Sequence, residues 1–174
     1  MSRQIRPVLV LTAICLVASV LLGAVHNATA PVAEAIAEER LHATYASLMP
    51  LAASFEEVDC DVEGCTTALE ALDHEGNKVG YVVVAQSKGY GGQVPLAVSF
   101  SLDGTVLDVA VLSNDETPGL GSRVAEDPYI GQYMGLAAEE RGVEETYLIS
   151  GATISSKAVL HAFNIAVEAY GVIA

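Results

Sequence analysis

The first apolar segment of the chain is long enough to cross a membrane. Residues 8–25 read VLVLTAICLVASVLLGAV and include no charged side chain. At about 1.5 Å of rise per residue, a helix of this length spans roughly 27 Å, close to the hydrocarbon thickness of about 30 Å of a bilayer. Arg3 and Arg6 precede the segment and the next basic residue is Arg40. The positive-inside rule therefore predicts a single-pass protein of the cell membrane, with a cytoplasmic N-terminus and an extracytoplasmic domain.

A cleaved signal peptide is the alternative interpretation of the same segment. Residues 28–30 read Ala-Thr-Ala, which resembles a signal-peptidase site after a basic start. The apolar part of a signal peptide is usually about 7 to 15 residues long, and this segment is longer, which favours a retained anchor. Both interpretations place the remainder of the chain outside the cytoplasm.

The rest of the chain changes from helical to strand periodicity and back. Residues 31–49 have apolar positions at near-helical spacing and predict an amphipathic helix that Pro50 ends, and the acidic residues 51–66 predict a loop. Strands joined by short turns are predicted at 68–72, 79–86, 94–102 and 106–112. A helix near 128–136, a short strand at 147–149 and a closing helix at 155–170 follow.

This order of elements predicts an α+β fold with an antiparallel sheet and flanking helices after the N-terminal transmembrane helix. We expect three parts. Residues 1–27 form the cytoplasmic N-terminus and anchor, 28–66 an amphipathic helix and acidic linker, and 67–174 the ligand-binding domain.

Charge and cysteine content exclude several kinds of partner and site. Only six basic residues follow the apolar segment, against all 22 acidic ones, so nucleic acid is a poor partner. Cys60 and Cys65 are close enough in sequence for a local disulfide, which an oxidising compartment permits. A lone C-x4-C pair supplies too few ligands for an iron–sulfur cluster, and the four histidines have no ligand spacing, so we predict no metal site.

The strongest candidate site is the run of small residues from Ser150 to Ser156, directly before the closing helix. Small side chains let the backbone approach a ligand, and free N–H groups at a helix N-terminus favour an anion such as phosphate. Serine and threonine before a helix are also ordinary N-caps. The residues by themselves leave both roles open.

Two loops rich in glycine are the other candidates. Residues 116–121 read Glu-Thr-Pro-Gly-Leu-Gly, and residues 88–93 read Lys-Gly-Tyr-Gly-Gly-Gln. The loops either form two walls of a cofactor pocket or are simple turns. The sequence has no dinucleotide-binding or Walker motif and no spacing that favours a Ser-His-Asp triad, so we predict no catalytic residue.

Taken together, these three segments resemble the FMN-binding domain family of the membrane Rnf and Na+-translocating quinone reductase complexes. Ser150-Gly151-Ala152-Thr153 resembles the flavin-attachment motif of that family, residues 116–121 its ETPGLG loop, and residues 89–92 its G-x-G-G loop. Their order after one membrane helix also matches. The resemblance covers nearly the whole chain and is greatest to the Rnf branch.

The resemblance implies that the phosphate of FMN is joined covalently to the hydroxyl of Thr153. A dedicated flavin transferase that uses FAD and magnesium would form this bond outside the cytoplasm. The family motif usually begins with an aspartate six residues before the threonine, and Tyr147 stands there in this chain. The resemblance assigns cofactor binding to further residues, which are Ser150, Gly151, Ala152, Ser155, Glu116, Thr117, Pro118, Gly119, Leu120, Gly121, Tyr90, Gly91 and Gly92.

The resemblance also implies a function. It predicts an electron-relay component of an ion-translocating ferredoxin:NAD oxidoreductase complex, with other membrane subunits as partners, rather than a stand-alone enzyme. The flavin would supply the redox chemistry, and the protein its orientation and environment. Two alternatives stay open, an exported membrane-anchored module that binds a ligand or scaffolds other subunits without redox chemistry, and a flavin carrier in another exported electron chain.

Overall fold

The computed structural model describes residues 2–174, with the side chains of residues 2–6 and Glu34 left aside. The chain divides into two compact units, Met1–His42 and Ala43–Ala174. The helices and strands are α1 (Ser2–Leu48), β1 (Ser54–Val58), β2 (Cys65–Leu72), β3 (Lys78–Lys88), β4 (Gln93–Ser101), β5 (Val106–Val111), α2 (Asp127–Ile130) and α3 (Thr153–Ile173).

The first unit is the apolar part of α1. Within residues 2–174, one helix is long and apolar enough to cross a membrane, and its most apolar window, in Pro7–Leu48, has a mean hydropathy of 2.8. The large apolar side chains from Val8 to Val25 are exposed along this helix. Such exposure is costly in water and favourable in lipid. The helix predicted over 31–49 is the last part of α1, which continues through Pro31 and ends at Leu48.

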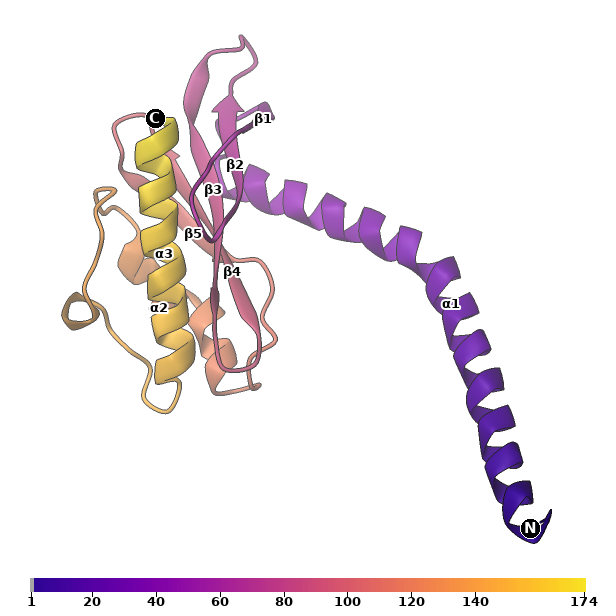
Figure 1. The fold of residues 1–174 in the computed structure, drawn as a ribbon. Coiled ribbons are helices and arrows are strands. Elements are labelled where there is room, and N and C mark those ends of the chain that lie inside the picture. The colour runs from indigo at the N-terminus through magenta and orange to yellow at the C-terminus, as the bar shows by residue number, and fades with distance from the viewer. Residues whose placement is uncertain (1) are drawn as a thin grey trace. The chain divides into compact units, whose positions relative to one another are not determined.

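The second unit is built on an antiparallel sheet of five strands in the order β1-β2-β3-β4-β5 (Figure 1). The four predicted strands are β2 to β5, and the predicted α+β class is confirmed. Val98 in the middle of β4 pairs with Val83 of β3 and Val109 of β5. Because neighbouring strands are also neighbours in sequence, short hairpins suffice to connect them.

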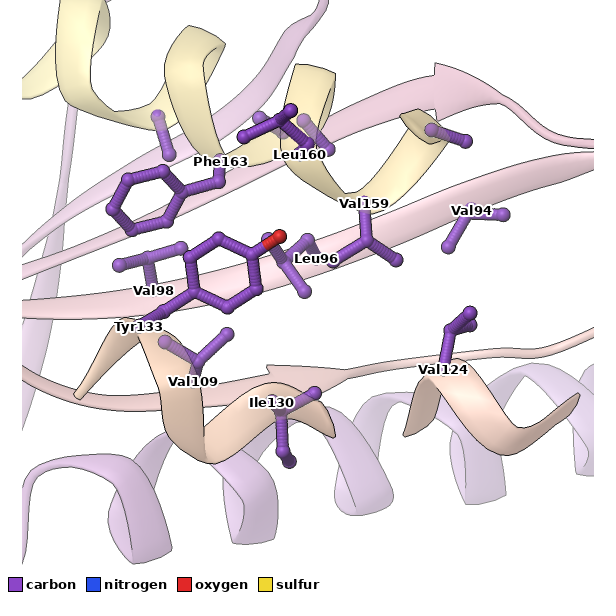
Figure 2. Close-up of a cluster of buried hydrophobic side chains, with 14 of the residues drawn as sticks. Val94, Leu96, Val98, Val109, Val124, Ile130, Tyr133, Val159, Leu160 and Phe163 are labelled. Carbon is purple, nitrogen blue, oxygen red and sulfur yellow. The ribbon is translucent and has the colours of Figure 1, made fainter. Parts of the chain in front are cut away.

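The main hydrophobic core lies between α3 and one face of this sheet. Figure 2 shows Val159, Leu160 and Phe163 of α3 beside Leu96 and Val98 of β4. These side chains are buried, as the predicted apolar stripe of the closing helix requires. The aromatic ring of Tyr133 closes the core with its centroid 4.7 Å from that of Phe163. Burial of this stripe fixes the rotation of α3 on the sheet and therefore the direction of its N-terminal turn.

The end of α1 covers part of the opposite face of the sheet. Tyr45 and Leu48 belong to a second buried cluster with Leu69 of β2 and Val82 of β3. The ring of Phe55 lies 6.0 Å from the ring of Tyr45. Residues 43–48 are thus part of the folded domain even though they belong to the same helix as the apolar segment.

Three predicted segments differ from the structure. The predicted loop 51–66 contains strand β1, which pairs with β2 at the edge of the sheet and has only Phe55 and Val58 half-buried, so its sequence alternation is weak. The predicted strand 147–149 is not a strand, because Tyr147 N donates to the side chain of Gln132 and Ile149 N to that of Ser156. The predicted helix 128–136 is shorter than expected, with α2 ending at Ile130.

Candidate functional site

The side chain of Glu116 joins the three candidate segments of the sequence. Its Oε1 atom accepts hydrogen bonds from Tyr90 N at 2.7 Å and from Gly91 N at 3.1 Å. Its Oε2 atom accepts one from Ser155 Oγ, in the first turn of α3, at 2.8 Å. One carboxylate therefore holds the loop after β3, the loop after β5 and the start of α3 together.

Glu116 is only 4% exposed, which is unusual for a carboxylate. Removing a carboxylate from water is costly unless hydrogen bonds replace its solvation. Three hydrogen-bond donors from the described residues supply that replacement, and none of the three donor groups is charged. The group is therefore a structural element of the site and is not part of an ion pair in this structure.

Two glycines leave the space that this carboxylate occupies. A Cβ atom at Gly89 would collide with Glu116 Oε1, and one at Gly121 would lie 2.7 Å from Glu116 Oε2 and 2.9 Å from Ser155 Oγ. Real Cβ atoms do not approach so closely. From the sequence, the two loops were expected either to form walls of a cofactor pocket or to be simple turns. Gly89 and Gly121 make room for the buried glutamate between them.

A cavity of about 500 Å³ opens beside this junction. Its volume lies within the range of about 300 to 1,000 Å³ that is typical of small-molecule sites. The wall combines apolar surface with hydroxyl groups and backbone, and Glu116 is the charged residue in it. The lining residues are Tyr90, Glu116, Thr117, Leu120, Gly121, Gly151, Ala152, Thr153, Ile154 and Ser155.

Nine of the fourteen predicted site residues line this cavity. The other five, which are Ser150, Pro118, Gly119, Gly91 and Gly92, do not. Of these, Gly91 still contributes a backbone hydrogen bond to Glu116. Ile154, whose side chain is 56% exposed at the cavity, was not predicted. A large apolar residue in the first turn of a helix, where the following serines are buried, is the signal that could have found it.

Thr153 occupies the first position of α3, and its side chain is exposed. The N-cap residue is Ala152, and no side-chain hydrogen bond caps the helix among the described residues. The structure therefore gives the Thr153 hydroxyl no capping role. The first N–H groups of an α-helix have no intrahelical acceptor, so this end of α3 favours an anion.

Further hydrogen bonds, from other parts of the domain, also fix the first turn of α3. Tyr129 Oη donates to the carbonyl of Ser156 at 2.9 Å, and Ser156 Oγ accepts from Ile149 N at 3.1 Å. Burial raises the pKa of the hydroxyl groups of Tyr129 and Tyr133 above 10.0, so both stay protonated at neutral pH. The backbone that carries Thr153 is therefore held by hydrogen bonds on both sides of the helix start.

A larger cavity, of about 750 Å³, lies elsewhere on the domain along α3. Its lining includes Glu63, Glu140, Glu168, Lys88 and His161. None of the fourteen predicted site residues lines it. Ligand pockets are mostly apolar with a few placed polar groups, so the smaller cavity at Thr153 is the better candidate site.

The two cysteines outside α1 lie next to each other but are not bridged in this structure. Burial, with a hydrogen bond that the Cys65 thiol donates to the Cys60 side chain, raises the pKa of Cys65 to about 12. A thiol with so high a pKa reacts slowly at neutral pH. The disulfide between Cys60 and Cys65 stays a prediction, and it does not touch the candidate site.

Comparison with known proteins points to the same segments. Residues 89–168 match the family model of the FMN-binding domain. The G subunit of the proton-translocating ferredoxin:NAD(+) oxidoreductase complex of Clostridium ljungdahlii is 32% identical over 166 residues, which cover 91% of this chain and 86% of that protein. The G subunit of the ion-translocating oxidoreductase complex of Methanosarcina acetivorans is 32% identical over 178 residues, which cover 96% and 95%.

A solved structure supports the fold. The C subunit of the Na(+)-translocating NADH-quinone reductase from Parabacteroides distasonis superposes with a TM-score of 0.50 and 20% identity, over 60% of each chain. At this identity the likeness concerns the fold. The antiparallel sheet with its closing helix is therefore an arrangement that proteins outside this group of relatives also use.

Proposed function

Because this chain belongs to the family of G subunits of ion-translocating Rnf-type oxidoreductase complexes, we propose that it relays electrons through one FMN joined covalently to Thr153. The observation that carries this proposal is the cavity at the start of α3, which Thr153 lines with an exposed hydroxyl. Segments far apart in the sequence meet there. If residues 150–156 only capped the helix and the two loops were only turns, these segments would not need to lie beside one cavity.

The residues around the cavity fit an FMN. Its phosphate would lie at the N-terminus of α3, where backbone N–H groups favour an anion. Its ring system is flat and has an apolar dimethylbenzene part, and Tyr90, Leu120 and Ile154 give the cavity wall apolar surface. Bound FMN supplies one- and two-electron redox chemistry, and the protein sets its orientation and solvent access.

Attachment would form a phosphodiester bond. The Thr153 oxygen would displace AMP from FAD, the hydroxyl proton would leave, and the FMN phosphate would remain on the threonine. A flavin transferase with magnesium would catalyse this step, and the exposure of Thr153 makes its oxygen accessible to such an enzyme. Covalent attachment keeps the flavin with its domain through every redox cycle.

The membrane helix and the attached flavin together suit a relay inside a complex. We propose residues 1–27 as cytoplasmic N-terminus and anchor, and residues 67–174, together with residues 43–66 of the predicted helix and linker 28–66, as the flavin domain outside the cytoplasm. Tethering by the helix raises the effective concentration of the flavin near the other membrane subunits.

The proposed topology is tested with protease added to spheroplasts. The protease should digest the domain, and full protection of the domain would contradict this topology.

The proposal is tested by the mass of the intact protein. The chain is produced in cells with and without the flavin transferase, purified in detergent and denatured before mass spectrometry. We expect one added FMN per chain only with the transferase. Unmodified polypeptide under both conditions would refute covalent attachment, and noncovalent FMN released on denaturation would leave the relay function with a different form of binding.

A further inference from the structure

Glu116 lines the cavity, but the hydrogen bonds of its oxygen atoms join it to the protein itself. Both oxygens already accept hydrogen bonds from protein donors, which are Tyr90 N, Gly91 N and Ser155 Oγ. The residue is 4% exposed. A carboxylate has about four lone-pair sites, and protein donors take three of them, so most of the hydrogen-bonding capacity of Glu116 is used within the protein.

The three donors come from two segments of the chain, and Tyr90 and Ser155 put both segments in the wall of the cavity. Tyr90 and Gly91 belong to the loop after β3, whereas Ser155 lies two residues beyond Thr153 in α3. Gly89 and Gly121 leave the space that the carboxylate occupies. The two segments therefore have a common attachment point within one helical turn of the proposed flavin site.

We propose that Glu116 is a positioning residue, whose carboxylate fastens the Tyr90–Gly91 loop to the first turn of α3 and so assembles the flavin cavity before FMN is attached. Tyr90, which is 73% exposed, is then held in the lining of the same cavity as Thr153. This inference rests on the proposed flavin site for its consequence, but its structural part concerns the flavin-free chain.

The shape of the side chain, and not its charge, is what this role requires. In Glu116→Gln, the amide oxygen can still accept from Tyr90 N and Gly91 N, and the amide nitrogen can donate to Ser155 Oγ. Glu116→Ala removes all three hydrogen bonds. A role that depended on negative charge would be lost in both variants, so the two substitutions separate the alternatives.

The first measurement uses the full chain in detergent, made without the transferase. Hydrogen exchange at the amides of Tyr90 and Gly91 is followed by mass spectrometry of the peptides that contain them. We expect exchange at least about 10-fold faster in Glu116→Ala than in the wild type, and near wild-type exchange in Glu116→Gln. Unchanged protection in Glu116→Ala, or equal loss in both variants, would overturn the proposal.

The second measurement is flavin loading in cells that contain the transferase. We expect Glu116→Ala to carry at least 10-fold less covalent FMN than the wild type, and Glu116→Gln at least half as much. Ser99→Ala is the matched control, because it removes a buried hydroxyl that bridges β4 and β5 through Asp108, away from the cavity. It should lower stability without changing loading or exchange at Tyr90.

The two measurements fail independently. If the wild type never acquires FMN, the proposed function fails, while hydrogen exchange still decides the role of Glu116. If Glu116→Ala does not fold, Glu116→Asp replaces it, since the shorter side chain cannot reach both segments at once. Normal protection and normal loading in Glu116→Asp would then refute the positioning role.

Discussion

The substitution Thr153→Ala separates a flavin attachment point from a helix cap, because the two roles predict different losses. Loss of a capping Ser or Thr costs about 0.5 to 2 kcal/mol. In the structure Thr153 is the first residue of α3, Ala152 is the N-cap, and no side chain that the structure describes caps the helix with a hydrogen bond. The substitution therefore removes no capping bond.

The expected free-energy change follows from the same geometry. Alanine is a better helix former than threonine by roughly 0.6 kcal/mol, and Thr153 is exposed, so little burial is lost. The free energy of unfolding of the flavin-free variant should therefore equal that of the wild type or exceed it by up to about 0.6 kcal/mol. Covalent flavin, in contrast, should disappear completely, since the alanine has no oxygen to form the phosphoester.

Stability is measured by denaturant unfolding of the flavin-free chain, and attachment by flavin fluorescence in a denaturing gel. Ser113→Ala is the matched control, since Ser113 is an exposed residue with a hydroxyl that does not line the cavity and is not among the assigned site residues, and this variant should keep its flavin. Thr153→Ser retains a hydroxyl and should keep part of it. Undiminished covalent FMN in Thr153→Ala would refute the site, and destabilisation by more than about 1 kcal/mol would refute the conclusion that Thr153 is not a cap.

Three further predictions follow from the packing of the domain. Gly121→Ala should cost about 1 to 3 kcal/mol and reduce flavin loading, because its Cβ would lie 2.7 Å from a buried carboxylate oxygen; Gly131→Ala, where a Cβ meets nothing within 4 Å, is the control and should be neutral in denaturant unfolding. Burial raises the pKa of Tyr133 above 10.0, so its stabilising effect is complete below pH 10 and is lost as pH rises further. Tyr133→Phe should reduce that alkaline loss, and equal pH profiles of unfolding would contradict this. Aerobically isolated chain should resist alkylation of Cys60 and Cys65 until reductant is added, and the bridge should add about 2 kcal/mol to the free energy of unfolding; full labelling without reductant would exclude the bridge.

The role of Glu116 shows most clearly what remains out of reach from the sequence. Its ETPGLG motif selected it as a cofactor ligand, whereas its hydrogen bonds join it to residues 25, 26 and 39 positions away. No local pattern encodes such contacts. They depend on how the sheet brings the ends of β3 and β5 together and on how α3 packs over them.

The same contrast applies to the secondary structure. The apolar segment, the strands β2 to β5 and the closing helix were all predictable, because each has a hydrophobic periodicity that depends only on its own residues. Strand β1 was not, since it packs only Phe55 and Val58 at a sheet edge. Residues 147–149 look like a strand in isolation, but their backbone donors bind side chains of Gln132 and Ser156.

The sequence by itself therefore determined the apolar helix that is long enough to span a membrane, the class of the domain and the three segments of the candidate site, since these are properties of local spacing and residue type. Only the tertiary structure decided that the segments share one cavity, that Gly89 and Gly121 accommodate a glutamate, and that Thr153 stands free of any cap. The physical reason is that burial and hydrogen bonding of a side chain depend on the partners that folding brings beside it, whatever their distance along the chain.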